Sequence, residues 1–341
     1  MITDILQKAI DGQDLDYAEA STVMDSMLDS SMLPSQFGAL VTALRLKGET
    51  ASELAGFAES MGRHAVRVNA HDTTLLDTCG TGGGKTRWLG ISTAAAFVAA
   101  GAGATVAKHG NRGVTRTAGS SDVLEALGVN VMADAKTVSQ SLVEARVGFM
   151  FAQVFHPAMR FVAPLRRELG FRTVFNVLGP LTNPAGAKHR LLGVGDPHLL
   201  DTIGQALGIL GVTRALVVHG HGGVDEISLS GPTKVVDVNS GQSSTYELSP
   251  ADFDLPISTG SDLLIDDASE VSDLTRSILS GSRSGPRRNV VLANASAALV
   301  ACGIARDWLD GVERATEAID NGSAHDSLDK LIEVSNRNSR T

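Results

Sequence analysis

The chain has 341 residues, of which 43% are hydrophobic and 20% are charged, and its net charge at pH 7 is −9. This length and composition exclude a disordered chain and predict a globular protein with one large domain and a smaller one. The acidic balance argues against a nucleic-acid binder that works through bulk charge. Cys79 and Cys302 are far apart and give neither a disulfide framework nor a zinc spacing, so we expect a cytoplasmic protein.

The first residues carry acids and lack an unbroken apolar run, so we expect no signal peptide. The most apolar stretch, AAAFVAAGAGATVA, is interrupted by glycines and is too short to span a bilayer. We therefore expect a soluble protein without a membrane segment.

Residues 1–70 are predicted to form a small helical domain. Residues 16–32 place five apolar side chains at helical spacing: Ala18, Val23, Met24, Met27 and Leu28. A second helix is predicted to open at Pro34 and stop at Gly48, with an apolar stripe at Phe37, Leu40, Val41 and Leu44. Thr50, followed three residues later by Glu53, predicts a capping box at the start of a third helix.

From about residue 72 the pattern changes to alternating strands and helices, which predicts an α/β fold with a central, mostly parallel sheet flanked by helices. We expect strands at 74–80, 104–110, 189–195, 214–220, 226–231 and 233–238. Helices are expected at 91–103, 119–129, 156–170 and over much of 289–320, and 240–256 is expected to be a loop. The α/β domain would comprise 71–155 and 186–341, and the helices in about 156–185 would complete the helical domain, with a cleft at the joint.

The segment CGTGGGKTRWLGIST, residues 79–93, places a glycine-rich turn between a predicted strand and a predicted helix. In that position, main-chain N–H groups and the helix dipole favour a phosphate or a pyrophosphate. The segment fits neither of two known phosphate motifs, because Cys79 replaces the first glycine of a Walker A loop and the spacing fails G-x-G-x-x-G. A structural tight turn stays open as the alternative, and Ser92 or Thr93 could be an ordinary N-cap.

Basic and polar residues gather in a second loop, which follows the strand at 104–110. Parallel strand ends of this kind are where open α/β sheets bind ligands. The loop and the following helix start contain Lys108, His109, Gly110, Asn111, Arg112, Thr115, Arg116 and Ser120. Further basic clusters are Lys85 with Arg87, and Arg160 with Arg166, Arg167 and Arg172. Such clusters on an acidic chain indicate a small anionic ligand.

Two further features carry chemistry. The adjacent acids Asp225 and Glu226 follow a predicted strand and a glycine-rich turn, and could supply hard oxygen ligands to Mg²⁺ or form a solvated turn. Arg166 offers a planar fork suited to a carboxylate, or else a surface ion pair. His156 precedes Pro157 at a helix entrance, where a structural role is equally open.

The motifs GTGG, KHGNR and GSSDVLEALG, together with residues 155–186 and 217–228, resemble the anthranilate phosphoribosyltransferase family over nearly the whole chain. The resemblance implies transfer of phosphoribosyl from phosphoribosyl pyrophosphate (PRPP) to anthranilate, with release of pyrophosphate, in tryptophan biosynthesis. It implies Mg²⁺ near Ser92, Asp225 and Glu226, and Lys108 with His109, a candidate base, as catalytic residues. It implies a homodimer through the helical domain, with which the 37–44 stripe is compatible.

By the same resemblance, PRPP is expected at Gly80, Thr81, Gly82, Gly83, Gly84, Ser92, Thr93, Lys108, Gly110, Asn111, Arg112, Thr115 and Ser120. Anthranilate is expected at Gly80, His109, Asn111, His156 and Arg166. The chain departs from the family pattern at Gly84 and Lys85 (for Asp-Gly), Trp88, Gly90 (for Asn), Thr115 and Arg116. We hypothesise that Lys85, Arg87 and Arg116 hold the pyrophosphate with more protein charge and less metal.

The altered donor loop leaves two alternative functions open. A paralogue of the same superfamily would take another aromatic acceptor, or would cleave nucleosides with free phosphate. A catalytically silent subunit would bind an anion or a partner without turnover. The intact block at 155–186 argues against the first alternative, and the acid pair Asp225 and Glu226 argues against the second.

Overall fold

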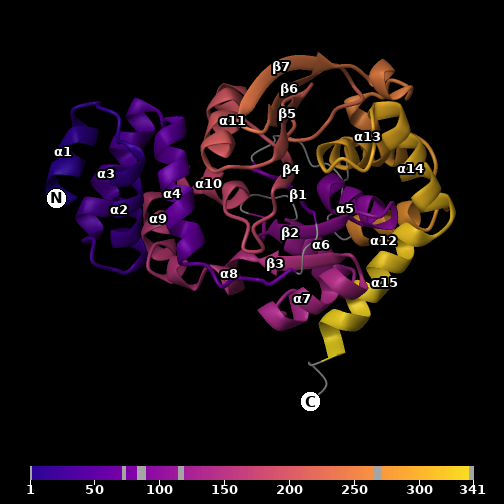
Figure 1. The fold of residues 1–341 in the computed structure, drawn as a ribbon, viewed down its shortest axis with the longest axis horizontal. Helices are drawn as coiled ribbons and strands as arrows, with labels where there is room; N and C mark the ends of the chain where they lie inside the picture. Colours follow the sequence, from indigo (N-terminus) through magenta and orange to yellow (C-terminus); the bar gives the residue numbers. More distant parts are fainter. Residues whose placement is uncertain (1, 71–73, 83–89, 114–118, 264–269, 338–341) are drawn as a thin grey trace.

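The structure, a computed structural model, describes residues 2–70, 74–82, 90–113, 119–263 and 270–337. Figure 1 shows a helical part that contains the N-terminus beside a larger part built around a twisted sheet. Among the described helices, none combines the length and the apolar character that crossing a bilayer requires.

The helical part begins with four helices: α1 (Ile2–Ile10), α2 (Tyr17–Leu28), α3 (Pro34–Lys47) and α4 (Ala51–Arg63). The predicted caps are confirmed. Thr50 Oγ1 accepts the N–H of Glu53, the Glu53 carboxylate accepts the N–H of Thr50, and Gly48 ends α3 with positive φ. In α2, Ala18 faces solvent, unlike the other four residues of the predicted stripe.

The apolar stripe of α3 is internal. Phe37, Leu40, Val41 and Leu44 are each no more than 2% exposed, inside a core that they share with α2 and α4. The expectation that this stripe is available for a dimer contact is therefore wrong, because a fully buried side chain cannot contact a second chain.

Segments from the middle of the chain pack against the helical part. These are the 3₁₀ turn η1 (Pro157–Arg160), α9 (Ala163–Leu169) and α10 (Phe175–Leu178). The preceding helix α8 (Ala152–Phe155) contacts β3 (Val147–Phe151) and belongs to a separate apolar cluster. Helix α9 contacts α3, and α10 contacts α4. Val162 and Phe175 join the apolar core of the N-terminal helices. The exact division into domains stays a prediction.

The larger part contains a seven-stranded sheet in the order β3-β2-β1-β4-β5-β6-β7. The strands are β1 (Leu75–Gly80), β2 (Thr105–Gly110), β3 (Val147–Phe151), β4 (His189–Gly193), β5 (Arg214–Gly220), β6 (Thr233–Asn239) and β7 (Gln242–Leu248). Strands β3, β2, β1, β4 and β5 pair in parallel, whereas β6 and β7 add antiparallel at one edge. The predicted α/β fold with a mostly parallel sheet is confirmed.

Helices cover both faces of the sheet (Figure 1). Because successive strand residues point to opposite faces, Leu191 packs with α5 (Ile91–Gly101) and α13 (Pro286–Ala301), whereas Leu192 packs with α11 (Leu200–Ile209). The remaining helices are α6 (Ser120–Ala126), α7 (Ala135–Glu144), α12 (Glu270–Leu279), α14 (Trp308–Asp320) and α15 (Ser323–Asn336).

Three strand predictions are wrong. Residues 226–231 form an irregular segment rather than a strand, the expected loop at 240–256 contains β7, and β3 was not predicted. Strand β7 is polar and mostly exposed because it lies at the edge and pairs with β6 alone. Ser240 and Gly241, both with positive φ, form the tight hairpin between them.

Candidate functional site

The candidate site lies where β1, β2, β4 and β5 end at the same edge of the sheet. Gly80 pairs with Gly193 across β1 and β4. A Cβ on Gly80 would lie 2.7 Å from the Asp225 Oδ2, and a Cβ on Gly193 would lie 1.6 Å from the Asp225 main-chain oxygen. Glycine is needed at position 193 because the main chain of the segment that carries Asp225 lies directly against it, whereas a side chain at position 80 would require the Asp225 carboxylate to move.

The start of the glycine-rich loop is held by main-chain contacts. Thr81 donates its N–H to the Gly193 oxygen (2.8 Å), and its hydroxyl accepts the N–H of Gly195 (3.1 Å). Gly82 has a φ of +62° and donates its N–H to Asp225 Oδ2 at 3.0 Å. Gly83, Gly84, Lys85, Arg87 and Trp88 lie outside the described residues, so their expected contacts stay predictions. The glycine-rich loop thus begins in direct contact with the Asp225 carboxylate.

Asp225 and Glu226 form a buried acidic pair. Glu226 Oε1 accepts the N–H of Ser92 at 3.2 Å, which ties the pair to the start of α5. Burial raises the pKa of Asp225, and burial together with the neighbouring Asp225 charge raises the pKa of Glu226 to about 8. Two adjacent carboxylates with such raised pKa values are stabilised by a cation, because a positive charge offsets both their desolvation and their repulsion.

This donor set fits Mg²⁺. The two carboxylates and the Ser92 hydroxyl are hard oxygen ligands, the kind that Mg²⁺ selects. The described parts of the chain contain no group of three or more His, Cys, Asp or Glu side chains that could hold a metal ion. A cation held by Asp225 and Glu226 would therefore keep waters or take further oxygens from a phosphate ligand, as Mg²⁺ commonly does.

Helix α5 begins beside this pair. Gly90 is its N-cap residue and has no side chain to cap the helix, so the predicted caps Ser92 and Thr93 lie in the first turn instead. Thr93 is 1% exposed and packs inward. The side chain of Ser92, in contrast, lies at the site, with its Oγ 3.4 Å from Lys108 Nζ.

Lys108 is buried at the end of β2. Its ammonium donates to the Thr78 main-chain oxygen and lies between β1 and the start of α5. Burial lowers its pKa. The Lys108 amine is thus held next to Ser92, and a catalytic role for Lys108 stays a prediction.

His109, at the end of β2, and His156, at the end of α8, face each other with their ring centroids 5.0 Å apart. His109 Nδ1 donates to the Gly179 oxygen at 3.0 Å, because a carbonyl can only accept. Burial lowers the pKa of His109 to about 4 and, together with His109, that of His156 to about 3. His109 Nε2 lacks a hydrogen-bond partner among the described residues and is free to accept, while a neutral His156 offers one N–H donor and one acceptor nitrogen.

Asp77, which the sequence reasoning missed, anchors the surrounding loops. Its carboxylate accepts the His109 N–H (3.1 Å) and the Asn183 side-chain amide (2.8 Å), and Asn183 also donates to the Ala107 oxygen. The loop 179–184 is thereby tied to β1 and β2. An acid at the centre of an otherwise buried strand was the available signal, because such a residue needs partners.

Arg166 lies on α9 with its guanidinium carbon 5.3 Å from the centre of the Phe175 ring. It has no carboxylate partner among the described residues, and burial lowers its pKa. A partly buried guanidinium that stacks on an aromatic ring suits a planar carboxylate ligand. The sequence reasoning missed Phe175, although an aromatic residue on a short helix was visible. Arg172, from the same region, donates to the Thr81 oxygen at 3.3 Å.

The second loop is only partly described. Gly110 packs against Ser120, whose Oγ would lie 2.0 Å from a Cβ at position 110. Asn111 is exposed, and its main-chain oxygen accepts a hydrogen bond from the Ser120 hydroxyl at 3.5 Å. Arg112 pairs with two acids of α6, Asp122 and Glu125, both at 2.9 Å. Thr115 and Arg116 lie outside the described residues.

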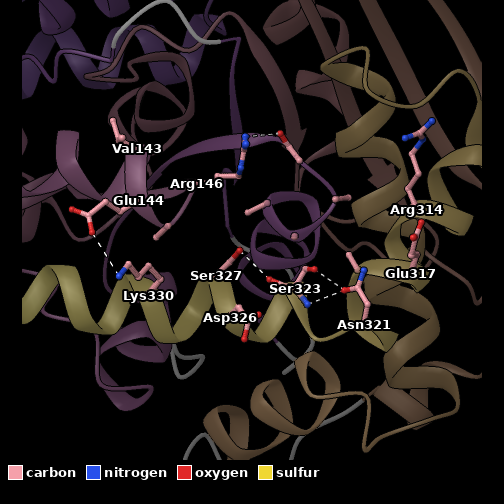
Figure 2. A pocket seen from close by; sticks show the side chains of 16 residues that line it. Val143, Glu144, Arg146, Arg314, Glu317, Asn321, Ser323, Asp326, Ser327 and Lys330 are labelled. Carbon is pink, nitrogen blue, oxygen red and sulfur yellow. Dashed lines mark hydrogen bonds and ion pairs between the residues drawn. The ribbon is translucent and has the colours of Figure 1, made fainter.

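A separate cavity of about 690 Å³ lies at the opposite end of α5, among α7, α14 and α15 (Figure 2). Some of its charged side chains form an ion pair with each other or a hydrogen bond to the main chain that lines the cavity. Lys330 lies 3.7 Å from Glu144, and Arg146 donates to the Gly103 oxygen at 3.1 Å. The predicted site residues are absent from its lining, so this cavity is distinct from the candidate site.

Comparisons with known proteins cover almost the whole chain. Residues 3–65 match the model described as "Glycosyl transferase family, helical bundle domain", and residues 72–325 match "Glycosyl transferase family, a/b domain". The anthranilate phosphoribosyltransferase of Roseiflexus castenholzii is 50% identical over 338 residues, which is 99% of each chain. That of Herpetosiphon aurantiacus is 48% identical, over 98% of this chain and 99% of its own.

Solved structures show the same fold. The anthranilate phosphoribosyltransferase of Thermus thermophilus matches with a TM-score of 0.92 and 42% identity, over 97% of this chain and 99% of its own. The Saccharomyces cerevisiae protein, solved in complex with PRPP and Mg, matches with a TM-score of 0.89 and 27% identity, over 98% and 97%. On the strength of these identities, the chain belongs to the anthranilate phosphoribosyltransferase family.

Proposed function

We propose that this protein is an anthranilate phosphoribosyltransferase, a Mg²⁺-dependent pentosyltransferase that joins the amine of anthranilate to the phosphoribosyl group of PRPP and releases pyrophosphate. The observation that carries the proposal is the contact between the glycine-rich loop and the acidic pair, through the hydrogen bond from Gly82 N–H to Asp225 Oδ2 at 3.0 Å. It joins a phosphate-type loop to cation ligands, which is the combination that a magnesium pyrophosphate group needs.

On the donor side, the pyrophosphate would lie against the loop that begins at Gly80, with Mg²⁺ held by Asp225, Glu226 and Ser92. The metal, when bound, supplies charge neutralisation for the leaving pyrophosphate. Lys108 lies next to Ser92 Oγ and, when protonated, would add positive charge near the leaving pyrophosphate. The other proposed donor contacts come from Thr81, Gly82, Gly83, Gly84, Thr93, Gly110, Asn111, Arg112, Thr115 and Ser120.

On the acceptor side, Arg166 would pair with the carboxylate of anthranilate while Phe175 holds the guanidinium in place. His109, His156, Asn111 and the main chain at Gly80 would complete the pocket. A neutral His109, donating Nδ1–H to the Gly179 oxygen, keeps the lone pair of Nε2 free to accept the amine proton. This is the role we propose for it as base.

The remaining catalysis comes from placement. The acceptor amine is itself the nucleophile, and the C1–O bond of the ribose breaks as pyrophosphate leaves, so an activated serine or cysteine is not needed. Holding the two substrates together can contribute about 7–11 kcal/mol. We propose that the helical part, which α9 and α10 join through their contacts with α3 and α4, helps to exclude water from the activated sugar.

The proposal is tested by following the fluorescence of anthranilate with PRPP and Mg²⁺. Decay that requires all three components supports it. A protein that cleaves nucleosides with phosphate but leaves anthranilate unchanged would instead be the paralogue considered above, and ligand binding without any turnover would indicate a silent subunit.

The departures in the donor loop support a further part of the proposal. Gly90 at the start of α5 offers no side-chain amide, and the acid typical of position 84 is replaced by glycine. We expect Lys85, Arg87 and Arg116 to offset part of this loss with direct positive charge. Titration of activity against Mg²⁺ tests it, and an ordinary two-metal dependence would contradict it.

A homodimer in the cytoplasm is also proposed, through a different face from the buried 37–44 stripe. A groove of about 750 Å³ runs between α1 and α3, lined mostly by small or apolar residues, such as Ile10, Gly38, Ala39 and Ala43, together with Lys47. Leu46 at its rim is 83% exposed. A second copy would cover these apolar side chains. Leu46→Glu should shift the protein to monomer in analytical ultracentrifugation, and an unchanged sedimentation coefficient would contradict this contact.

A further inference from the structure

Asn294 is a polar residue buried in the middle of α13, far along the chain from the acidic pair. Its side chain is 0% exposed and lies in an otherwise alanine-rich and valine-rich helix. Burying an amide is unfavourable unless its donors and acceptor are all paired. The bonds that pair it therefore indicate why the position is not apolar.

The amide binds both main-chain groups of one residue. Asn294 Oδ1 accepts the N–H of Ile227 at 2.9 Å, and Nδ2 donates to the Ile227 oxygen at 3.0 Å. Nδ2 also donates to the Val290 oxygen, one turn earlier in α13, at 2.8 Å. The third bond fixes the side chain on its own helix, and the first two fix the peptide planes on both sides of Ile227.

Ile227 directly follows Glu226. The segment that carries the acids leaves β5 through a turn with two positive-φ glycines, Gly222 and Gly223, and is joined back at Val224, whose oxygen accepts the N–H of Gly220 at 2.9 Å. Asp225 and Glu226 are thus the two residues between that bridge and the Asn294 clamp. Without the clamp, the downstream end of this short segment would lose two hydrogen bonds.

We infer that Asn294 is a positioning residue of the cation site: by fixing the main chain at Ile227 from α13, it sets where the carboxylates of Asp225 and Glu226 lie. The inference rests on the proposed role of these acids as ligands of Mg²⁺. Residues that orient metal ligands affect metal affinity without touching the metal.

The test measures cation binding rather than activity alone. Binding of Mn²⁺, used as the probe, is followed by electron paramagnetic resonance on the full-length protein. Asn294→Leu keeps a similar volume and removes all three bonds, and we expect Mn²⁺ affinity to fall by about tenfold or more. Asn294→Asp, which keeps an acceptor for Ile227 N–H, should lose less affinity and serves if the leucine variant fails to fold.

Ser296 provides the matched control on the same helix. It is also fully buried, and its hydroxyl donates to the Trp308 oxygen at 2.7 Å, away from the acids. Ser296→Ala should lower thermal stability yet leave Mn²⁺ affinity unchanged. Hydrogen exchange adds a local readout, since the Ile227 amide should lose protection in the Asn294 variants and keep it in Ser296→Ala.

The outcomes separate this inference from the proposed function. If Asp225→Asn with Glu226→Gln abolishes Mn²⁺ binding while the Asn294 variants bind normally, the positioning role is overturned and the metal site stands. If Ser296→Ala loses as much affinity as Asn294→Leu, the effect is general destabilisation and the inference is equally overturned. If the double acid variant binds Mn²⁺ like the wild type, the proposed site itself fails.

Discussion

His109 and His156 lie with their ring centroids 5.0 Å apart and their planes inclined by 51°, although they come from β2 and from the end of α8. Burial keeps both neutral by lowering their pKa values, and each has at least one ring nitrogen without a partner among the described residues. Two neutral imidazoles at this spacing can accept hydrogen bonds from an amine without repelling each other.

The first prediction concerns acid stability. The pKa of His109 is about 4 in the folded protein against 6.5 for the free side chain, so the unfolded state binds a proton first as pH falls. The contribution of neutral His109 to the free energy of unfolding is fully present above pH 6.5. It is lost as the pH falls from 6.5 to 4, which lowers the free energy of unfolding by about 3 kcal/mol. His109→Gln should flatten this part of the melting-temperature profile.

His198 provides the control for that experiment because it is exposed and distant in sequence from the pair. His198→Gln should follow the wild-type profile. An unchanged slope in His109→Gln between pH 6.5 and 4 would contradict the neutral, buried state of the ring.

The second prediction concerns the acceptor carboxylate. Arg166→Ala should raise KM for anthranilate by about tenfold to a hundredfold, as expected for a charged hydrogen-bond partner worth about 1.5–3 kcal/mol, with little change in KM for PRPP. Arg160 also lies over a ring, 4.6 Å from that of Phe161, but at an exposed position. Arg160→Ala should therefore leave both constants near wild type. An equal loss for both substrates in Arg166→Ala would refute the assignment.

The third prediction concerns the acidic pair. Asp225→Asn combined with Glu226→Gln removes both negative charges and should abolish Mg²⁺-dependent turnover while the protein remains folded. Melting temperature should rise, because the pKa values of both acids are raised in the folded state and their charges are therefore unfavourable there. Retained turnover, measured by anthranilate fluorescence, would remove the metal assignment.

The fourth prediction concerns close packing at the end of β4. Gly193→Ala would place a Cβ 1.6 Å from the Asp225 main-chain oxygen, so the strand end or the acidic segment must move. We expect a stability loss of about 1–3 kcal/mol and a large loss of turnover. Gly62→Ala is the control, since Gly62 lies in α4 with open space around it and should gain about 0.5–1 kcal/mol. A fully active Gly193→Ala would show that the contact is dispensable.

Much of the fold was predictable because local chemistry determines it. Thr50 and Glu53 cap α4 as expected, and Pro34 and Gly48 mark the ends of α3, since caps depend on neighbours a few residues away. Strand β7 was not predictable in the same way. Its polar residues are stable as a strand only because β6 supplies hydrogen-bond partners. Apart from the turn at Gly241, no local sequence signal indicates that pairing.

The candidate site was predictable as a set of motifs but not as a set of contacts. Asp225 and Glu226 stand out as adjacent acids after a strand, whereas Asn294 looks like one polar residue in a helix until it meets Ile227. Asp77 and Asn183 are likewise distant in sequence and meet only in the folded sheet. Periodicity and spacing cannot reveal such pairs, because they describe one segment at a time.

The clamp between Asn294 and Ile227 bears on when, during synthesis of the chain, the cation site can form. Helix α13 leaves the ribosome well after the strands that carry the glycine-rich loop and the acids. We expect a nascent chain that ends before residue 286 to bind divalent cations poorly even where its sheet has formed. Synthesis would then yield the activated-sugar site only near completion, which limits wasteful hydrolysis of the donor by unfinished chains.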